Sequence, residues 1–158
     1  MPRVLTLCSL FALAALAPEA QPLRATDVVE WAAAVEPGDA PGTALFVATA
    51  RVREGWRLYA ADSPTGYPLR LTLGALPPGI SARGPLRQTP PREHTDPVLN
   101  ETYTYHAGSA RVAQGLALDR RAAGRHRLPA RVRFTVCNDE VCLPPATADL
   151  RATLSAGG

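Results

Sequence analysis

The feature that most constrains the fold is a set of short segments in which apolar and polar residues alternate. In residues 67–73, leucines occupy every second position, so that Arg70 and Thr72 would point the other way. A repeat of two residues is that of a β-strand with one buried face. Similar or shorter apolar segments occur at residues 28–31, 44–52, 56–60, 101–108, 110–118, 130–136 and 148–154. The sequence therefore predicts seven or eight strands.

Prolines and glycines separate these segments. The 158 residues include 16 prolines and 12 glycines, which argue against long helices. Residues 81–97 are rich in Pro, Arg and Gln without periodicity, and we predict a loop there. Many short strands between turn signals favour an all-β fold, an immunoglobulin-like antiparallel β-sandwich, with Trp31 and Trp56 as core anchors.

The first twenty residues resemble an export signal. Arg3 precedes an apolar run from Val4 to Ala17, which is too short to span a bilayer well. We predict a signal peptide at about residues 1–20, which would remove Cys8, and a single domain at residues 21–158. The protein would be periplasmic or otherwise exported, and its two remaining cysteines would form a disulfide by default.

These cysteines lie in the segment VCNDEVCLPP, residues 136–145. The four residues between them suit a hairpin loop that would place Cys137 opposite Cys142, close enough for a disulfide. If the alternation of residues 130–136 continues, Cys137 points away from the core together with Arg133. It would then be reachable from solvent. Arg133 would favour a thiolate there, and the acidic residues of the loop would oppose it.

Three interpretations of the pair are open. A disulfide that closes so short a loop stabilises a fold by roughly 2 kcal/mol at most, so an exposed pair here is a plausible redox centre. A purely structural disulfide fits the spacing equally well. A metal site is the weakest interpretation, because zinc needs about four ligands and the histidines show no ligand spacing. We expect no metal.

Other polar residues suggest no second chemistry. Ser63, His94 and Asp96 lack the motif that surrounds a hydrolase nucleophile. The net charge is +3, and the basic stretch at residues 120–133 is predicted to be a solvated Gly/Pro loop entering a strand. It has no aromatic residues for base stacking, so we expect no nucleic-acid partner.

The segment at residues 136–145 resembles the cysteine loop of the N-terminal periplasmic domain of the disulfide reductase DsbD. Residues 54–73 also resemble that family's Trp-containing strand, its turn and its Leu-alternating strand, and the likeness covers about residues 28–154. The resemblance implies a protein-disulfide reductase-like redox relay with an immunoglobulin-like fold and no cofactor. It assigns Cys142 to the mixed disulfide and Cys137 to its resolution.

The resemblance also implies the partners. Electrons would come from a thioredoxin-like donor and pass to periplasmic disulfide isomerases or cytochrome c maturation proteins, through transient mixed disulfides. The family's cap loop, which shields the cysteines, matches residues 94–101, with Asp96, Val98 and Leu99 as candidate cap and partner-binding residues. No membrane electron carrier is recognised in the chain, so we expect the carrier to be a separate protein. We expect this chain to be a monomer. The alternative is a binding or accessory sandwich domain with a structural Cys137–Cys142 disulfide.

Overall fold

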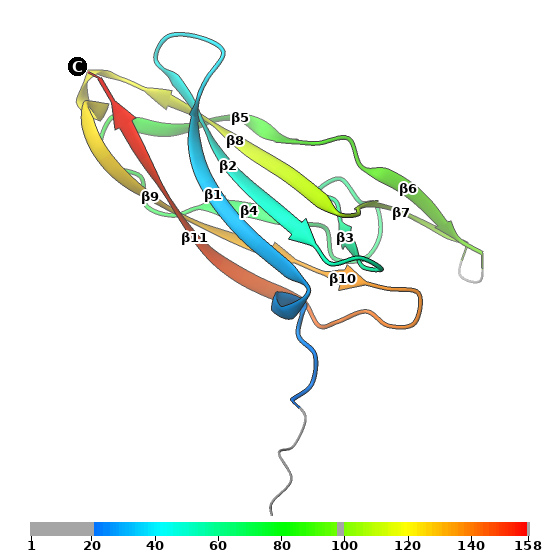
Figure 1. The fold of residues 1–158 in the computed structure, drawn as a ribbon. Coiled ribbons are helices and arrows are strands. Elements are labelled where there is room, and N and C mark those ends of the chain that lie inside the picture. The colour runs from blue at the N-terminus through cyan, green and yellow to red at the C-terminus, as the bar shows by residue number, and fades with distance from the viewer. Residues whose placement is uncertain (1–20, 98–99, 158) are drawn as a thin grey trace, which may run out of the picture.

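The computed structural model describes residues 21–97 and 100–157, and strands make up most of them (Figure 1). The strands are β1 (Val29–Pro37), β2 (Thr43–Val52), β3 (Arg57–Tyr59), β4 (Arg70–Leu73), β5 (Ile80–Gln88), β6 (Arg92–Asp96), β7 (Glu101–His106), β8 (Ser109–Leu118), β9 (Gly124–Phe134), β10 (Val136–Cys137) and β11 (Ala146–Ala156). Two short 3₁₀ helices accompany them, η1 (Ala25–Asp27) and η2 (Arg120–Ala122). No helix in the described part of the chain has the length and hydropathy of a membrane span.

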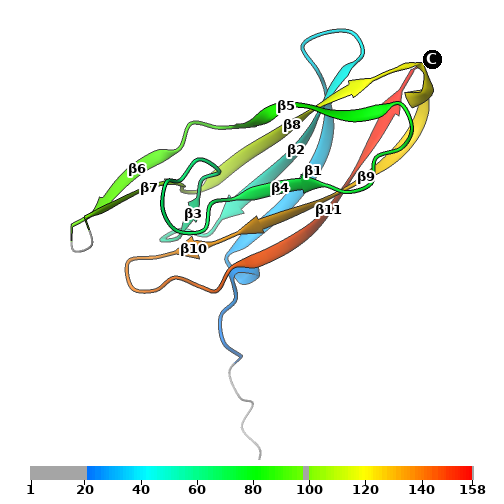
Figure 2. The same cartoon turned by 180° about the vertical axis from the view of Figure 1, so that it is seen from behind.

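The strands form three antiparallel sheets. One has the order β1-β2-β8-β5 and packs against the second, β11-β9-β4, as the two layers of a sandwich (Figures 1 and 2). The third, β10-β3-β7-β6, extends the sandwich at one end, and the chain's C-terminus lies at the opposite end. This architecture confirms the predicted immunoglobulin-like antiparallel sandwich.

The core lies between the two layers, where the alternating residues meet. Val132 and Phe134 of β9 are fully buried, as their spacing predicts, and the exposed Arg131 and Arg133 point outward. Trp31 packs its ring 5.5 Å from that of Phe134, and Trp56 is buried. Both tryptophans therefore contribute to the core, as predicted.

The predicted loop at residues 81–97 is wrong, because most of it forms β5 and β6. Both are edge strands with largely exposed side chains, so no apolar alternation marks them. Gly84 adopts φ 69° where the β5–β8 register shifts, and Pro85 follows it. A bulge in an edge strand accommodates both residues. The basic stretch is also more regular than predicted, since β9 already begins at Gly124.

Candidate functional site

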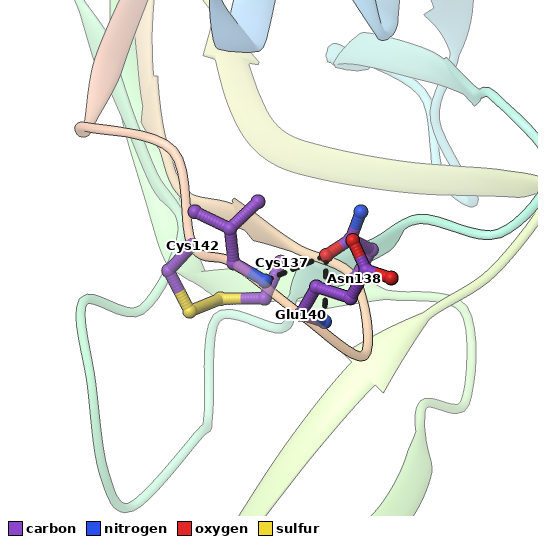
Figure 3. Close-up of a disulfide and its surroundings, with 5 residues drawn as sticks. Cys137, Asn138, Glu140 and Cys142 are labelled. Atoms are coloured by element: carbon purple, nitrogen blue, oxygen red, sulfur yellow. Dashed lines mark hydrogen bonds between the residues drawn. A yellow bond between two sulfur atoms is a disulfide. The ribbon is translucent and has the colours of Figure 1, made fainter.

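The two cysteines close a short hairpin that extends from β10. Cys137 is bonded to Cys142 with an S–S distance of 2.04 Å, and their Cα atoms are 4.0 Å apart (Figure 3). The two residues pair as an isolated antiparallel bridge. Beyond them, the amide of Leu143 donates to the carbonyl of Val136 at 3.0 Å. The hairpin predicted from the sequence is confirmed.

Asn138 holds the loop of this hairpin in shape. Its backbone amide donates to the carbonyl of Val141 at 2.9 Å. Its side-chain oxygen accepts from the amides of Glu140 and Val141, at 2.9 and 2.7 Å (Figure 3). Asparagine forms such turns because its short side chain replaces a backbone acceptor. These hydrogen bonds therefore add to the disulfide in ordering the loop.

The two sulfur-bearing residues differ in exposure. Cys137 is 5% exposed, whereas Cys142 is exposed. The prediction that solvent reaches Cys137 is wrong. Its register opposite Arg57 still places it outside the main core cluster, but the hairpin and the neighbouring strand cover it. The exposure of the two residues therefore favours attack at Cys142 over attack at Cys137.

Arg57 of β3 provides the charge beside the cysteines. It pairs with Cys137 in the β3–β10 register, and its guanidinium donates to a carboxylate oxygen of Asp139 at 2.6 Å. This hydrogen bond raises the pKa of Arg57 above its ordinary value. The guanidinium also lies 5.6 Å from the ring centroid of Tyr105. Arg57 was not predicted from the sequence, because only the pairing of β3 with β10 brings it to the site.

Arg133, which the sequence suggested as the thiolate-stabilising group, has a different contact. Its guanidinium lies 5.8 Å from the ring centroid of Tyr67, and Arg133 pairs with Thr147 and Arg70 on neighbouring strands. Arg57 is therefore better placed than Arg133 to act on Cys137.

An aromatic face adjoins Arg57 on the same sheet. Tyr59 is paired with Tyr105, and its ring meets that of Tyr103 edge-on with centroids 5.2 Å apart. Tyr103 also contacts the rings of Tyr105 and His94, at 5.9 and 5.2 Å. We call these four half-buried residues the tyrosine face. Directly opposed residues project to one side of a sheet, and Tyr59 is two residues from Arg57 on the same strand. The tyrosine face therefore lies on the same side of the sheet as Arg57 and Cys137.

Of the three predicted cap residues, Asp96 is the one that the structure describes. Asp96 ends β6, which is separated from the cysteine-bearing β10 by β3 and β7. Three strand spacings amount to about 14 Å, so the structure does not bring Asp96 to the disulfide. β6 and β7 extend from the same end of the molecule as the cysteine hairpin, as a separate projection (Figures 1 and 2). Val98 and Leu99 lie outside the described residues.

The other polar candidates are not assembled into a site. Ser63 is buried and bonds to backbone groups of Thr65 and Thr104, while His94 packs on Tyr103. The residues described by the structure contain no group of three His, Cys, Asp or Glu side chains arranged to hold a metal ion. The cysteine hairpin is thus the described site with evident reactivity.

Comparison with known proteins gives matches over most of the chain. The family model for the N-terminal part of the thiol:disulfide interchange protein DsbD matches residues 24–153. The reduced N-terminal domain of DsbD from Neisseria meningitidis is similar, with 17% identity over 86% of this chain and 91% of that chain and a TM-score of 0.48. The N-terminal periplasmic domain of ScsB from Proteus mirabilis has a TM-score of 0.51, with 14% identity over 78% of this chain and 44% of that chain. No curated protein sequence matches the chain.

Proposed function

Because this chain belongs to the family of DsbD N-terminal domains, we propose that it is an exported redox relay. Its Cys137–Cys142 disulfide would exchange with the cysteine pairs of thioredoxin-like proteins. The observation that carries the proposal is the difference in exposure between the two cysteines of one short hairpin. Exchange needs one accessible sulfur for attack and a second sulfur for resolution.

The reaction starts from the disulfide. A donor thiolate attacks Sγ of Cys142, the bond to Cys137 breaks, and Cys137 leaves as a thiolate. The donor's second thiolate then attacks the donor sulfur of the mixed disulfide and releases Cys142. Two electrons have moved to the domain, the donor has become a disulfide, and protons from solvent neutralise the thiolates according to pH. The reduced pair passes the electrons on by the reverse sequence, with Cys142 attacking an acceptor disulfide and Cys137 resolving it.

The surroundings of Cys142 suit transient docking. Val141 is 49% exposed, and Pro144 and Pro145 are also exposed. These apolar residues provide a small contact surface beside the reactive sulfur without a deep pocket. Asp96, the last residue of β6 at the same end of the molecule, would add contacts to a bound partner.

The cellular setting follows from family membership and from the predicted signal peptide. The domain would act in the periplasm as a monomer, with a separate membrane protein as its electron source. Disulfide isomerases or cytochrome c maturation proteins would be its acceptors. The reduced domain would reduce a disulfide in each acceptor by way of a transient mixed disulfide.

The reduction potential of the native disulfide tests the proposal. The folded protein is equilibrated in glutathione or dithiothreitol redox buffers, and free thiols are trapped. Exchange proteins have potentials between roughly −120 and −270 mV, and we expect a value in that range. A potential below about −300 mV, or reduction only on unfolding, would identify a structural disulfide. The accessory binding domain would then be the better description.

Trapping separates the roles of the two cysteines. In Cys137→Ala, the exposed Cys142 should form stable mixed disulfides with thioredoxin-like proteins, because nothing resolves them. The matched variant Cys142→Ala leaves only the covered Cys137 and should trap little. Equal trapping by the two variants would contradict the assigned order of attack.

A further inference from the structure

The outer face of the sheet β11-β9-β4 carries an unusual concentration of arginine. Six exposed arginines share this face, which we call the arginine face: Arg70, Arg125, Arg127, Arg131, Arg133 and Arg151. Four of them occupy alternate outward positions of β9, while Leu128, Ala130 and Val132 between them point into the core. The sheet that carries them is the layer nearest the viewer in Figure 2.

Strand register confirms that the six side chains point to one side. Arg133 lies directly opposite Arg70 of β4, and Arg131 lies opposite Asp149 of β11. Arg151 is opposite Pro129, another outward position of β9. Directly opposed residues project to the same side of a sheet. Residues two apart on one strand are about 6.6 Å apart, so the arginines on β9 are spread over about 26 Å.

The charge on this face exceeds that of the whole chain. Asp149 is the one carboxylate at the outward positions of these strands, so six arginines and one aspartate give a net charge of +5. The chain as a whole has a net charge of +3, which leaves a net of −2 elsewhere. The positive charge is therefore concentrated on one side of the molecule.

Little within the protein neutralises these arginines. Arg131 bonds to Asp149 at 2.9 Å, and among the described residues it alone of the six is in an ion pair. Arg70 and Arg133 are directly opposed like charges, an arrangement that destabilises a sheet. An anion bound from outside would offset this repulsion.

We propose that the arginine face binds the anionic phospholipids of a membrane surface. The guanidinium group matches phosphate geometry and forms bidentate hydrogen bonds with it. The six charges do not converge on one pocket. One surface hollow is lined by Arg70 and another by Arg131, and neither is lined by a second arginine of the face. A row of phosphates on a flat surface fits this spacing better than one small anion does.

The remaining residues of the face favour lipid over a protein partner. The other outward positions of β11 are polar, namely Thr147, Thr153 and Ser155. A protein interface normally has an apolar centre, which these positions do not provide. Tyr67 is 59% exposed beside Arg133, and tyrosine is enriched at the membrane–water interface.

Membrane binding would also orient the redox site. Arg133 precedes Cys137 by four residues, and β9 leads directly into β10 and the hairpin. A domain lying on its arginine face would keep Cys142 at one end, near the membrane surface, where a membrane-embedded donor could reach it. The binding itself involves no cysteine, so it goes beyond the proposed redox function and does not depend on it.

Vesicle co-sedimentation of the full chain tests this inference. Phosphatidylcholine vesicles with about one third phosphatidylglycerol are compared with pure phosphatidylcholine vesicles. Apolar binding by the N-terminal segment contributes equally to both, so the difference reports binding to the anionic lipid. Each arginine near an anionic surface contributes about fivefold to binding. Arg127→Gln with Arg133→Gln should therefore reduce the phosphatidylglycerol-dependent binding by roughly 25-fold, and about 0.5 M salt should abolish it.

The matched control is Arg51→Gln with Arg83→Gln. Both arginines are exposed on the opposite layer, and neither is in a described ion pair. This variant has the same net charge as the first and should bind nearly as well as the unaltered chain. Equal loss in both variants, or no dependence on phosphatidylglycerol, would overturn the proposal. Face-dependent binding to polyglutamate without vesicle binding would also overturn it, in favour of an acidic protein partner. Unchanged thermal midpoints would establish that both variants fold.

Discussion

Arg57 lies opposite Cys137 in the β3–β10 pair, and Asp139 compensates its charge. A positive charge near a cysteine pair stabilises the thiolates and hence the reduced state. Asp139→Asn removes the compensation and should make the reduction potential less negative by roughly 10–30 mV. Arg57→Gln should shift the potential in the opposite direction. Equilibration with glutathione measures both shifts.

The neighbouring Glu140 provides the control for this prediction. It is exposed, and no ion pair involves it among the described residues. Glu140→Gln changes the net charge by the same amount as Asp139→Asn but should shift the potential much less. Equal shifts would mean that overall charge, and not the Arg57–Asp139 contact, sets the potential.

His106 gives the fold a dependence on pH. It is 3% exposed, and its Nε2 lies 3.2 Å from the side-chain oxygen of Gln88. Burial lowers the pKa of His106, and the charge of Asp62 only partly offsets this effect. The unfolded state, with a histidine pKa of about 6.5, therefore binds a proton more readily than the folded state. Stability is full above that pH and is lost as the pH falls below it.

Urea denaturation between pH 8 and pH 5 tests this dependence. The unaltered protein should lose free energy of unfolding as the pH falls through about 6.5. His106→Gln keeps a polar group near Gln88 but cannot take up the proton, so its curve should fall less steeply. The pKa of Asp62 is lowered, so this carboxylate stays ionised over the range. The other carboxylates contribute equally to both proteins, so the difference between the curves isolates His106. Parallel curves would contradict the prediction.

At the scale of single elements, the cysteine hairpin depends on Asn138 for its shape. Replacement by alanine removes an acceptor that serves two backbone amides, at a cost of about 1–2 kcal/mol to the hairpin. Asn138→Ala should therefore allow faster alkylation of the reduced Cys137, because the loop no longer covers it. Asn138→Asp retains the acceptor oxygen and should protect Cys137 as the unaltered residue does. If the aspartate variant reacts as fast as the alanine variant, the hydrogen bonds are not what orders the loop.

A comparison of strands shows what could be predicted from the sequence. β4 and the second half of β9 have one face in the core, so their alternation is visible in the sequence, and both were predicted correctly. β5 and β6 lie at sheet edges with little buried surface, so local sequence carries no signal for them. Alternation predicts which side of the sheet Cys137 points to. Its burial depends on tertiary contacts, which local sequence does not reveal. The role of Arg57 is likewise invisible until β3 and β10 pair.

At the scale of the whole molecule, the sandwich and the cysteine hairpin are supported by different contacts. β1 pairs with β2 over nine residues, and β9 pairs with β11 over eleven. β10 pairs with β3 through only two residues, Val136 and Cys137. Most of the stabilising ladders and the core thus lie away from the cysteines. A domain built this way can open and close its disulfide while the sandwich remains folded.

Hydrogen–deuterium exchange of the oxidised and reduced protein tests this separation. Reduction should raise exchange at residues 136–143, because the disulfide is the one covalent constraint on a hairpin held by few backbone bonds. Exchange in β2, β8 and β9 should stay unchanged, since local opening leaves the larger cooperative unit intact. If reduction raised exchange throughout the sandwich, the disulfide would be holding the fold together. The same pair of cysteines would then be a staple, and the redox relay would lose its structural basis.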